Sequence, residues 1–120
     1  MANTLLGNLV GKTIYSITGA EKGSMEVDFH VVGFGTYRMY HRQDCCEHVS
    51  IDQIDGDIND LLNSPITLAE ESTNRDNPPK NADSFTWTFY RFATVNGYVT
   101  FKWLGESNGY YSEGVDFELL

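Results

Sequence analysis

The chain has 120 residues, with 17 acidic and 8 basic side chains and a formal net charge of -9. This length fits one domain, residues 1–120, and the 41% hydrophobic content argues against disorder. The acid excess argues against direct binding to nucleic acid or to an anionic membrane, because affinity for phosphate comes from Lys and Arg.

The N-terminal part of the chain alternates between apolar and polar residues at the period of a β-strand. The clearest run is Met25 to Val31, where Val27 and Phe29 alternate with acidic residues. This pattern predicts a strand with one buried face and one solvated face. Further short strands are predicted at residues 12–18, 36–41 and 49–51.

The middle of the chain predicts one short helix and one long loop. Asp57 can cap a helix over residues 57–62, and Pro65 prevents the helix from continuing. A short strand is predicted at residues 66–71. Residues 72–83 contain two adjacent prolines and no large apolar side chain, so we expect an exposed loop there.

The C-terminal third is predicted to form three antiparallel strands joined by two tight turns. The first strand covers residues 85–95 and begins with three alternating aromatic residues. Asn96-Gly97 and Asn108-Gly109 are dipeptides that favour two-residue hairpin turns. The second and third strands are predicted at residues 99–103 and 111–119.

These elements together predict a mainly β fold of the α+β class. About seven strands would form an antiparallel sheet or a small sandwich, with one short helix near residues 57–62. No apolar run approaches the ~20 residues of a membrane-spanning helix. Residues 1–10 lack the basic start and the apolar run of a secretory signal, so we expect a soluble intracellular protein.

Cys45 and Cys46 are the two cysteines of the chain and are neighbours in the sequence. Neighbouring cysteines cannot join distant segments. In a strand their side chains also point to opposite faces, which opposes a bond between them. We therefore expect two separate thiols in a reducing cytosol.

Residues 40–48 concentrate histidine, cysteine and carboxylate side chains. A zinc site of His41, one cysteine and His48 would use suitable ligands, but no second cysteine pair completes the usual spacing. A cysteine nucleophile with a histidine base is a second interpretation. However, six acids and no Lys or Arg lie between Asp44 and Asp60, and this charge raises the pKa of a thiol.

A third interpretation of residues 40–48 is a strand end that buries one cysteine as a small apolar side chain. We prefer this interpretation, and we predict no catalytic residue, no metal ligand and no cofactor. A hydrolase that depends on a metal or on a Cys/His pair is kept as an alternative.

Residues 103–113 (WLGESNGYYSE) place aromatic rings beside small polar residues, which is the composition of a recognition loop. The alternative is that Trp103 and Tyr111 belong to the core and that the polar residues form only a turn. If the end of the strand at 36–41 and the Asn108-Gly109 turn converge, they create one composite site. The predicted ligand- or partner-binding residues are Tyr40, His41, Asp44, Glu47, Trp103, Glu106, Asn108 and Tyr110.

Two stretches of the chain carry a resemblance to known proteins. The first contains YRMYH at residues 37–41 and QDCCE at residues 43–47. The second contains TWTFYR at residues 86–91 and WLGESNGYYSE at residues 103–113. In this order, the chain resembles a family of small phage and prophage proteins known as a domain of unknown function. The resemblance implies a bacterial virus origin and expression in the host cytoplasm, and it implies no reaction.

We therefore expect a small acidic phage accessory protein that acts by non-catalytic binding and counters a host defence. Its partner would be a host protein or a small nucleotide signal. An acidic surface can also imitate nucleic acid toward a basic protein, provided that the acids group on one face. A structural virion component is a further alternative, and the sequence does not fix the oligomeric state.

Overall fold

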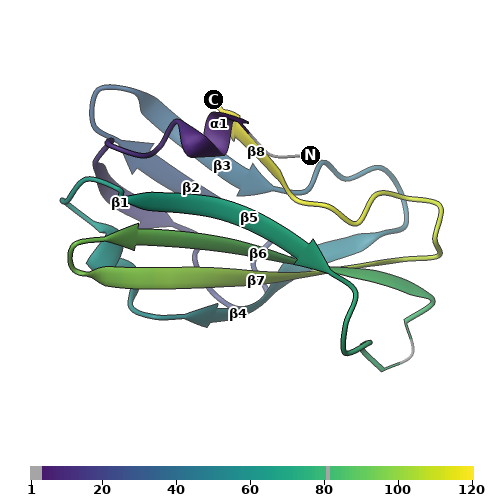
Figure 1. Ribbon diagram of the computed structural model, residues 1–120. Coiled ribbons are helices and arrows are strands. Elements are labelled where there is room, and N and C mark those ends of the chain that lie inside the picture. The colour runs from purple at the N-terminus through teal and green to yellow at the C-terminus, as the bar shows by residue number, and fades with distance from the viewer. Residues whose placement is uncertain (1–3, 81) are drawn as a thin grey trace.

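The computed structural model describes residues 4–80 and 82–120, which form a two-layered β-sandwich (Figure 1). Eight strands within these residues form two four-stranded antiparallel sheets, so the predicted mainly β fold is confirmed. The described residues also contain one short α-helix, α1 (Thr4–Gly7), and one 3-10 helix, η1 (Ile58–Leu61). No helix among them is long and apolar enough to cross a membrane.

The first sheet takes its strands from both ends of the chain, and the second sheet takes its strands from the middle. The first sheet has the order β1-β2-β3-β8 and the second has the order β4-β7-β6-β5. The strands of the first sheet are β1 (Ile14–Thr18), β2 (Glu26–Val31), β3 (Gly35–Tyr40) and β8 (Asp116–Leu119). The strands of the second sheet are β4 (His48–Asp55), β5 (Leu68–Asn74), β6 (Ser84–Thr94) and β7 (Gly97–Ser107). The chain therefore builds the whole second sheet before it returns to the first with β8.

The core lies between the two sheets and contains the residues that alternate inward. Val27, Phe29 and Val31 of β2 are buried, as their period of two predicted. The Phe29 ring lies 5.3 Å from Phe92 of β6 and 5.8 Å from Phe101 of β7, measured between ring centroids. These aromatic contacts join the first sheet to the second.

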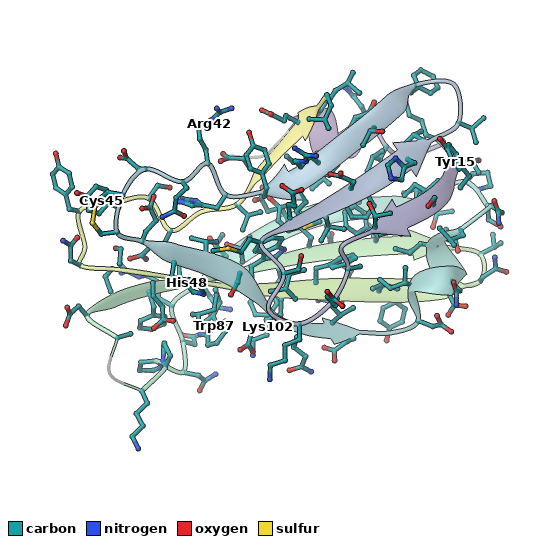
Figure 2. All side chains as sticks on the ribbon, turned by 180° about the vertical axis from the view of Figure 1, so that it is seen from behind. Tyr15, Arg42, Cys45, His48, Trp87 and Lys102 are labelled. Atoms are coloured by element: carbon teal, nitrogen blue, oxygen red, sulfur yellow. A yellow bond between two sulfur atoms is a disulfide. The ribbon has the colours of Figure 1, made fainter. Side chains whose placement is uncertain are left out.

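The outer face of the second sheet carries the aromatic residues that begin β6. Because Tyr90 and Phe92 point into the core, the alternating residues Phe85, Trp87 and Phe89 point outward. The Trp87 indole N–H donates a hydrogen bond to the Asp76 carbonyl oxygen at 2.7 Å. The Lys102 Nζ lies 4.3 Å from the Trp87 ring centroid (Figure 2). These contacts leave Trp87 only 8% exposed although it faces away from the core.

The predicted three-strand meander is wrong in its third strand. β6 and β7 form the first hairpin, but Thr94 pairs with Gly97, so the connecting residues are Val95 and Asn96. After β7 the chain does not turn back along it. Residues 108–115 cross to the first sheet, where β8 pairs with β3.

The middle of the chain follows the prediction with shifted boundaries. The Asp57 carboxylate accepts a hydrogen bond from the Asn59 N–H at 2.9 Å, as a helix cap does. The helix that it caps is the short η1 rather than an α-helix over residues 57–62. The predicted loop begins later, at residue 75, because β5 continues through Asn74.

Candidate functional site

Three connections meet at one end of the sandwich: residues 41–47, the described residues 75–80 and 82–83 of the 75–83 connection, and residues 108–115 (Figure 1). We call this the loop end. Residues near all three connections line a cleft of about 360 Å³. The lining residues are Cys46, His48, Ala82, Asp83, Glu106, Ser107 and Asn108. The connection after β3 and the connection that contains Asn108-Gly109 therefore both reach this cleft, and Glu106 and Asn108 are the predicted site residues that line it.

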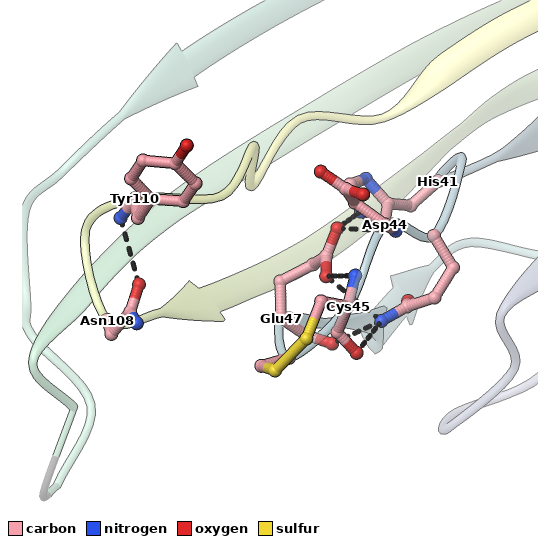
Figure 3. The surroundings of a disulfide bond; sticks show 8 residues. His41, Asp44, Cys45, Glu47, Asn108 and Tyr110 are labelled. Carbon is pink, nitrogen blue, oxygen red and sulfur yellow. Dashed lines mark hydrogen bonds and ion pairs between the residues drawn. A yellow bond between two sulfur atoms is a disulfide. The ribbon is translucent and has the colours of Figure 1, made fainter.

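The carboxylate of Glu47 holds the 41–47 connection together (Figure 3). It accepts hydrogen bonds from the backbone N–H groups of Asp44 at 2.9 Å and of Cys45 at 2.8 Å. It also accepts from His41 Nε2 at 2.8 Å and from Gln43 Nε2 at 3.1 Å. The connection therefore folds around one carboxylate, and we call this arrangement the Glu47 clasp.

His41 joins the Glu47 clasp to the connection before β8. Its Nδ1 donates to the Gly114 carbonyl oxygen at 2.7 Å, while its Nε2 faces the Glu47 carboxylate. Both partners are hydrogen-bond acceptors, so each ring nitrogen faces an oxygen atom. The side chains of His41 and Glu47 are 3% and 0% exposed, and they form a buried ion pair.

The environment of Glu47 stabilises its ionised form. Burial by itself raises the pKa of this carboxyl group, but the hydrogen bonds from His41 and from three backbone N–H groups outweigh that effect. Together they lower the pKa from its ordinary value of 4.5 to about 2. Glu47 is therefore a charged anchor at neutral pH and is not poised to exchange a proton.

A second buried carboxylate, Glu113, holds the 108–115 connection. Its Oε1 accepts from the Thr86 hydroxyl at 2.8 Å, and its Oε2 accepts from the Ser107 hydroxyl. Burial raises the pKa of Glu113, but the hydroxyl hydrogen bonds, led by that of Ser107, outweigh it and lower the pKa. These contacts attach the connection to β6 and β7, and we call them the Glu113 clasp.

Gly105 allows the Glu113 clasp to close. A Cβ atom at Gly105 would lie 2.1 Å from the Glu113 carbonyl oxygen and 2.8 Å from the Glu113 Cβ. Real Cβ atoms do not approach other atoms this closely, so only glycine fits at this position without movement. The glycine of the WLGESNGYYSE motif therefore serves the close approach of two backbone segments.

The residues between the two ends of the Glu113 clasp turn outward. The Ser107 hydroxyl accepts from the Gly109 N–H, and the Asn108 side chain accepts from the Tyr110 N–H, both at 2.9 Å. The Tyr110 side chain is 82% exposed, and its ring meets the Tyr111 ring edge-on at 5.0 Å. Side-chain bonds to the backbone explain why Asn108-Gly109 forms part of a wider loop instead of a hairpin turn.

Four of the predicted binding residues lie at the surface of the loop end. Asp44, Asn108 and Tyr110 are exposed, and Glu106 is half-buried at the cleft. Asp44 belongs to the 41–47 connection, whereas the others belong to β7 and the connection that follows it. Figure 3 shows Asn108 and Tyr110 on one side of the disulfide and Asp44 on the other.

The other four predicted residues lie elsewhere or are buried. Trp103 is fully buried, and its indole N–H donates to Met39 Sδ at 3.0 Å, so Trp103 belongs to the core. His41 and Glu47 lie beneath the surface in the Glu47 clasp. Tyr40 points to the outer face of the first sheet, where its hydroxyl donates to Glu118 at 2.8 Å. That hydrogen bond raises the pKa of Tyr40.

Several residues that shape the loop end were absent from the predicted set. Ser107, Asp83 and His48 line the cleft, and Glu113 holds the connection behind it. The sequence offered one signal for Glu113, because each of the two motifs ends in a glutamate. Asp83 carried no such signal, since it reaches the cleft through the fold of the 75–83 connection.

The structure contradicts the expectation of two separate thiols. Cys45 and Cys46 are joined by a disulfide bond, and both residues are exposed. They lie in the connection between β3 and β4 rather than in a strand. The alternation that separates neighbouring side chains in a strand does not apply there, which is why the prediction was wrong.

The arrangement does not favour the hydrolase alternative. No group of three or more His, Cys, Asp or Glu side chains in the described part of the chain is placed to hold a metal ion. Both ring nitrogens of His41 already hold other partners, and neither cysteine is a free thiol. A Cys/His catalytic pair would need groups that are engaged in this structure.

The fold and the loop end define a β-sandwich that presents surface loops on a rigid scaffold, a common place for binding residues. The chain belongs to the family described as domain of unknown function DUF7448, whose family model matches residues 7–117. No curated protein and no solved structure matches the chain.

The Glu47 clasp predicts a specific dependence of stability on pH. Because folding lowers the pKa of Glu47 to about 2, its stabilising contribution is full above about pH 5 and is lost as the pH falls toward 2. We expect Glu47→Gln to lower the free energy of unfolding at pH 5.5 and to lower it much less at pH 3. Urea denaturation of both proteins at the two pH values measures the difference. An equal difference at both would contradict the role of the ionised carboxylate.

The close approach at Gly105 predicts that Gly105→Ala is costly. The added methyl group must push the Glu113 backbone away, and we expect a loss of about 1–3 kcal/mol in the free energy of unfolding. Gly114→Ala is the matched control, because its Cβ would meet only the Ser112 hydroxyl at an ordinary 3.7 Å. Denaturant unfolding compares the two variants. Equal losses would show that the contact at Gly105 does not constrain the loop.

Proposed function

We propose that the protein is a non-catalytic binding protein of phage or prophage origin, whose loop end engages a basic surface on a host protein. The observation that carries this proposal is Tyr110, a large aromatic side chain that is 82% exposed on a tightly bonded loop. The neighbouring side chains of Asn108 and Ser112 accept hydrogen bonds from the loop backbone, whereas the Tyr110 ring lies edge-on to Tyr111 and is otherwise open to solvent. An exposed ring on a fixed loop is suited to recognition rather than to catalysis.

The fixed loop matters because binding costs conformational entropy. A side chain that is already held near its bound position loses less freedom when a partner arrives. Tyrosine gives a large contact area for two rotatable angles, which is why recognition loops use it often. The Glu113 clasp and the Asn108 hydrogen bond hold the backbone on which Tyr110 stands.

The charges beside Tyr110 favour a basic partner. The cleft next to it is lined by two acids, Asp83 and Glu106, and by no Lys or Arg. The net charge of -9 adds a long-range attraction for positive surfaces. A nucleotide would bring phosphate groups toward these carboxylates and be repelled. We therefore favour a host protein with exposed Lys or Arg over a small nucleotide signal.

The phage origin and the action against a host defence are proposed on the basis of the resemblance that the two motifs described above carry. Imitation of nucleic acid by one acidic face is not part of the proposal. Exposed acids lie on both sheets, with Glu26 and Asp116 on the first and Asp55 and Glu70 on the second. The charge that guides a partner to the loop end is therefore a property of the whole surface together with the local cleft.

Affinity capture from bacterial host lysate tests the proposed function when it compares three forms of the protein. Tyr110→Ala removes the exposed ring, and Tyr98→Ala removes a ring that is 67% exposed outside the loop end. We expect a host protein that is captured by the wild type and by Tyr98→Ala. Its capture by Tyr110→Ala should fall roughly thirtyfold, the loss that a hot spot of about 2 kcal/mol gives.

The identified partner then allows a direct measurement. Its affinity should fall with added salt, because screening weakens the attraction between an acidic and a basic surface. Equal capture by all three forms would contradict the role assigned to Tyr110. If Tyr110→Ala loses a bound nucleotide that the wild type and Tyr98→Ala retain, and no protein is lost, the choice of a protein partner is wrong.

A further inference from the structure

We propose that the Cys45–Cys46 pair is a redox switch at the loop end, opened by a low-molecular-weight thiol and closed by the corresponding disulfide. The inference deepens the proposed function, because the pair borders the cleft assigned to the partner. The switch itself is a property of the protein alone and can be measured without a partner. Four observations carry it, concerning exposure, position, chain topology and hydrogen bonding.

The disulfide is accessible and lies at the centre of the loop end. Both cysteines are exposed, and Cys46 lines the cleft together with Glu106 and Asn108. On the other side of the same connection, Asp44 and Glu47 line a second cleft of about 310 Å³. A small thiol in solution can therefore approach the exposed pair. Because this connection lines both clefts, a change in its conformation alters the walls of both.

The disulfide does not serve to staple the fold. A disulfide stabilises a protein chiefly by closing a loop of the unfolded chain, and the effect grows with the length of the loop. Cys45 and Cys46 are adjacent, so their bond closes no loop beyond the peptide unit that joins them. Exposed disulfides without a structural role belong to the labile and regulatory class.

The backbone of the bonded pair is part of the Glu47 clasp. The Cys45 N–H donates to Glu47 Oε1 at 2.8 Å, and the Cys45 carbonyl oxygen accepts from Gln43 Nε2 at 3.3 Å. The closed disulfide restricts rotation about the bonds on both sides of these groups. Opening it releases that restriction, so the clasp holds its N–H donors less firmly.

The chemical step is an ordinary thiol–disulfide exchange. A thiolate attacks one protein sulfur, the Cys45–Cys46 bond breaks, and the displaced sulfur leaves as a thiolate and takes up a proton. A second thiol attacks the mixed disulfide and releases the other cysteine as a thiol. In total two thiols are oxidised to one small disulfide while the protein gains two electrons and two protons. The reverse sequence closes the switch.

Alkylation and hydrogen exchange of the full chain test the proposal. The protein is equilibrated in mixtures of reduced and oxidised glutathione and then alkylated. Its mass, measured by mass spectrometry, gives the number of alkylated thiols. We expect the pair to pass from the bonded form to two alkylated thiols as reduced glutathione increases. On reduction the Asp44 and Cys45 amides should exchange roughly fivefold faster, the effect of weakening one hydrogen bond. The midpoint of urea unfolding should fall only slightly, by no more than the weakening of one hydrogen bond gives.

The double variant Cys45→Ser/Cys46→Ser is the matched control, and its amides should exchange at one rate in every mixture. Two outcomes would overturn the switch: a pair that never bonds in oxidised glutathione, or a pair that changes state without affecting these amides. A large fall in the urea midpoint on reduction would also overturn it, because the bond would then be a structural staple. None of these results depends on partner capture, so they are distinct from a failure of the proposed function.

Discussion

The loop end of this protein depends on one buried ion pair, formed by His41 and Glu47. The carboxylate of Glu47 gathers donors from its own connection, and His41 passes the attachment on to Gly114. Removing either partner would leave a buried charge without compensation, which is strongly unfavourable. This pair therefore ties the start of the second sheet to the approach of β8, although the two segments lie far apart in the sequence.

The Glu113 clasp repeats the same design on the neighbouring connection. In both cases a motif ends in a glutamate that turns inward and accepts hydrogen bonds from nearby donors. The residues between these anchors are left at the surface, where Asp44, Asn108 and Tyr110 stand. Each motif thus combines a structural glutamate with exposed residues, and the exposed residues are the ones available for recognition.

The sequence predicted the strands well where one face is apolar and the other is solvated. The alternation in β2 and the capping role of Asp57 are both confirmed. The predictions that failed depended on contacts beyond the local pattern. Asn108-Gly109 favours a hairpin by itself, but β8 completes the first sheet instead. Trp103 belongs to a stretch with the composition of a recognition loop. Its position in β7 nevertheless turns its side chain toward Met39 in the core. Half of the predicted site residues lie at the surface of the loop end. Strand register turns Trp103 into the core and Tyr40 to the outer face of the first sheet, whereas His41 and Glu47 are buried by their pairing in a connection.

The central claim is that the two buried carboxylates hold a rigid loop end that presents Tyr110. Backbone relaxation by NMR measures this rigidity directly, on the wild type and on Glu113→Gln. We predict an order parameter of about 0.85 for the Tyr110 amide in the wild type, the value of rigid backbone, and a clear decrease in the variant while β7 keeps its values. An order parameter below ~0.6 in the wild type, or no change in the variant, would contradict the account.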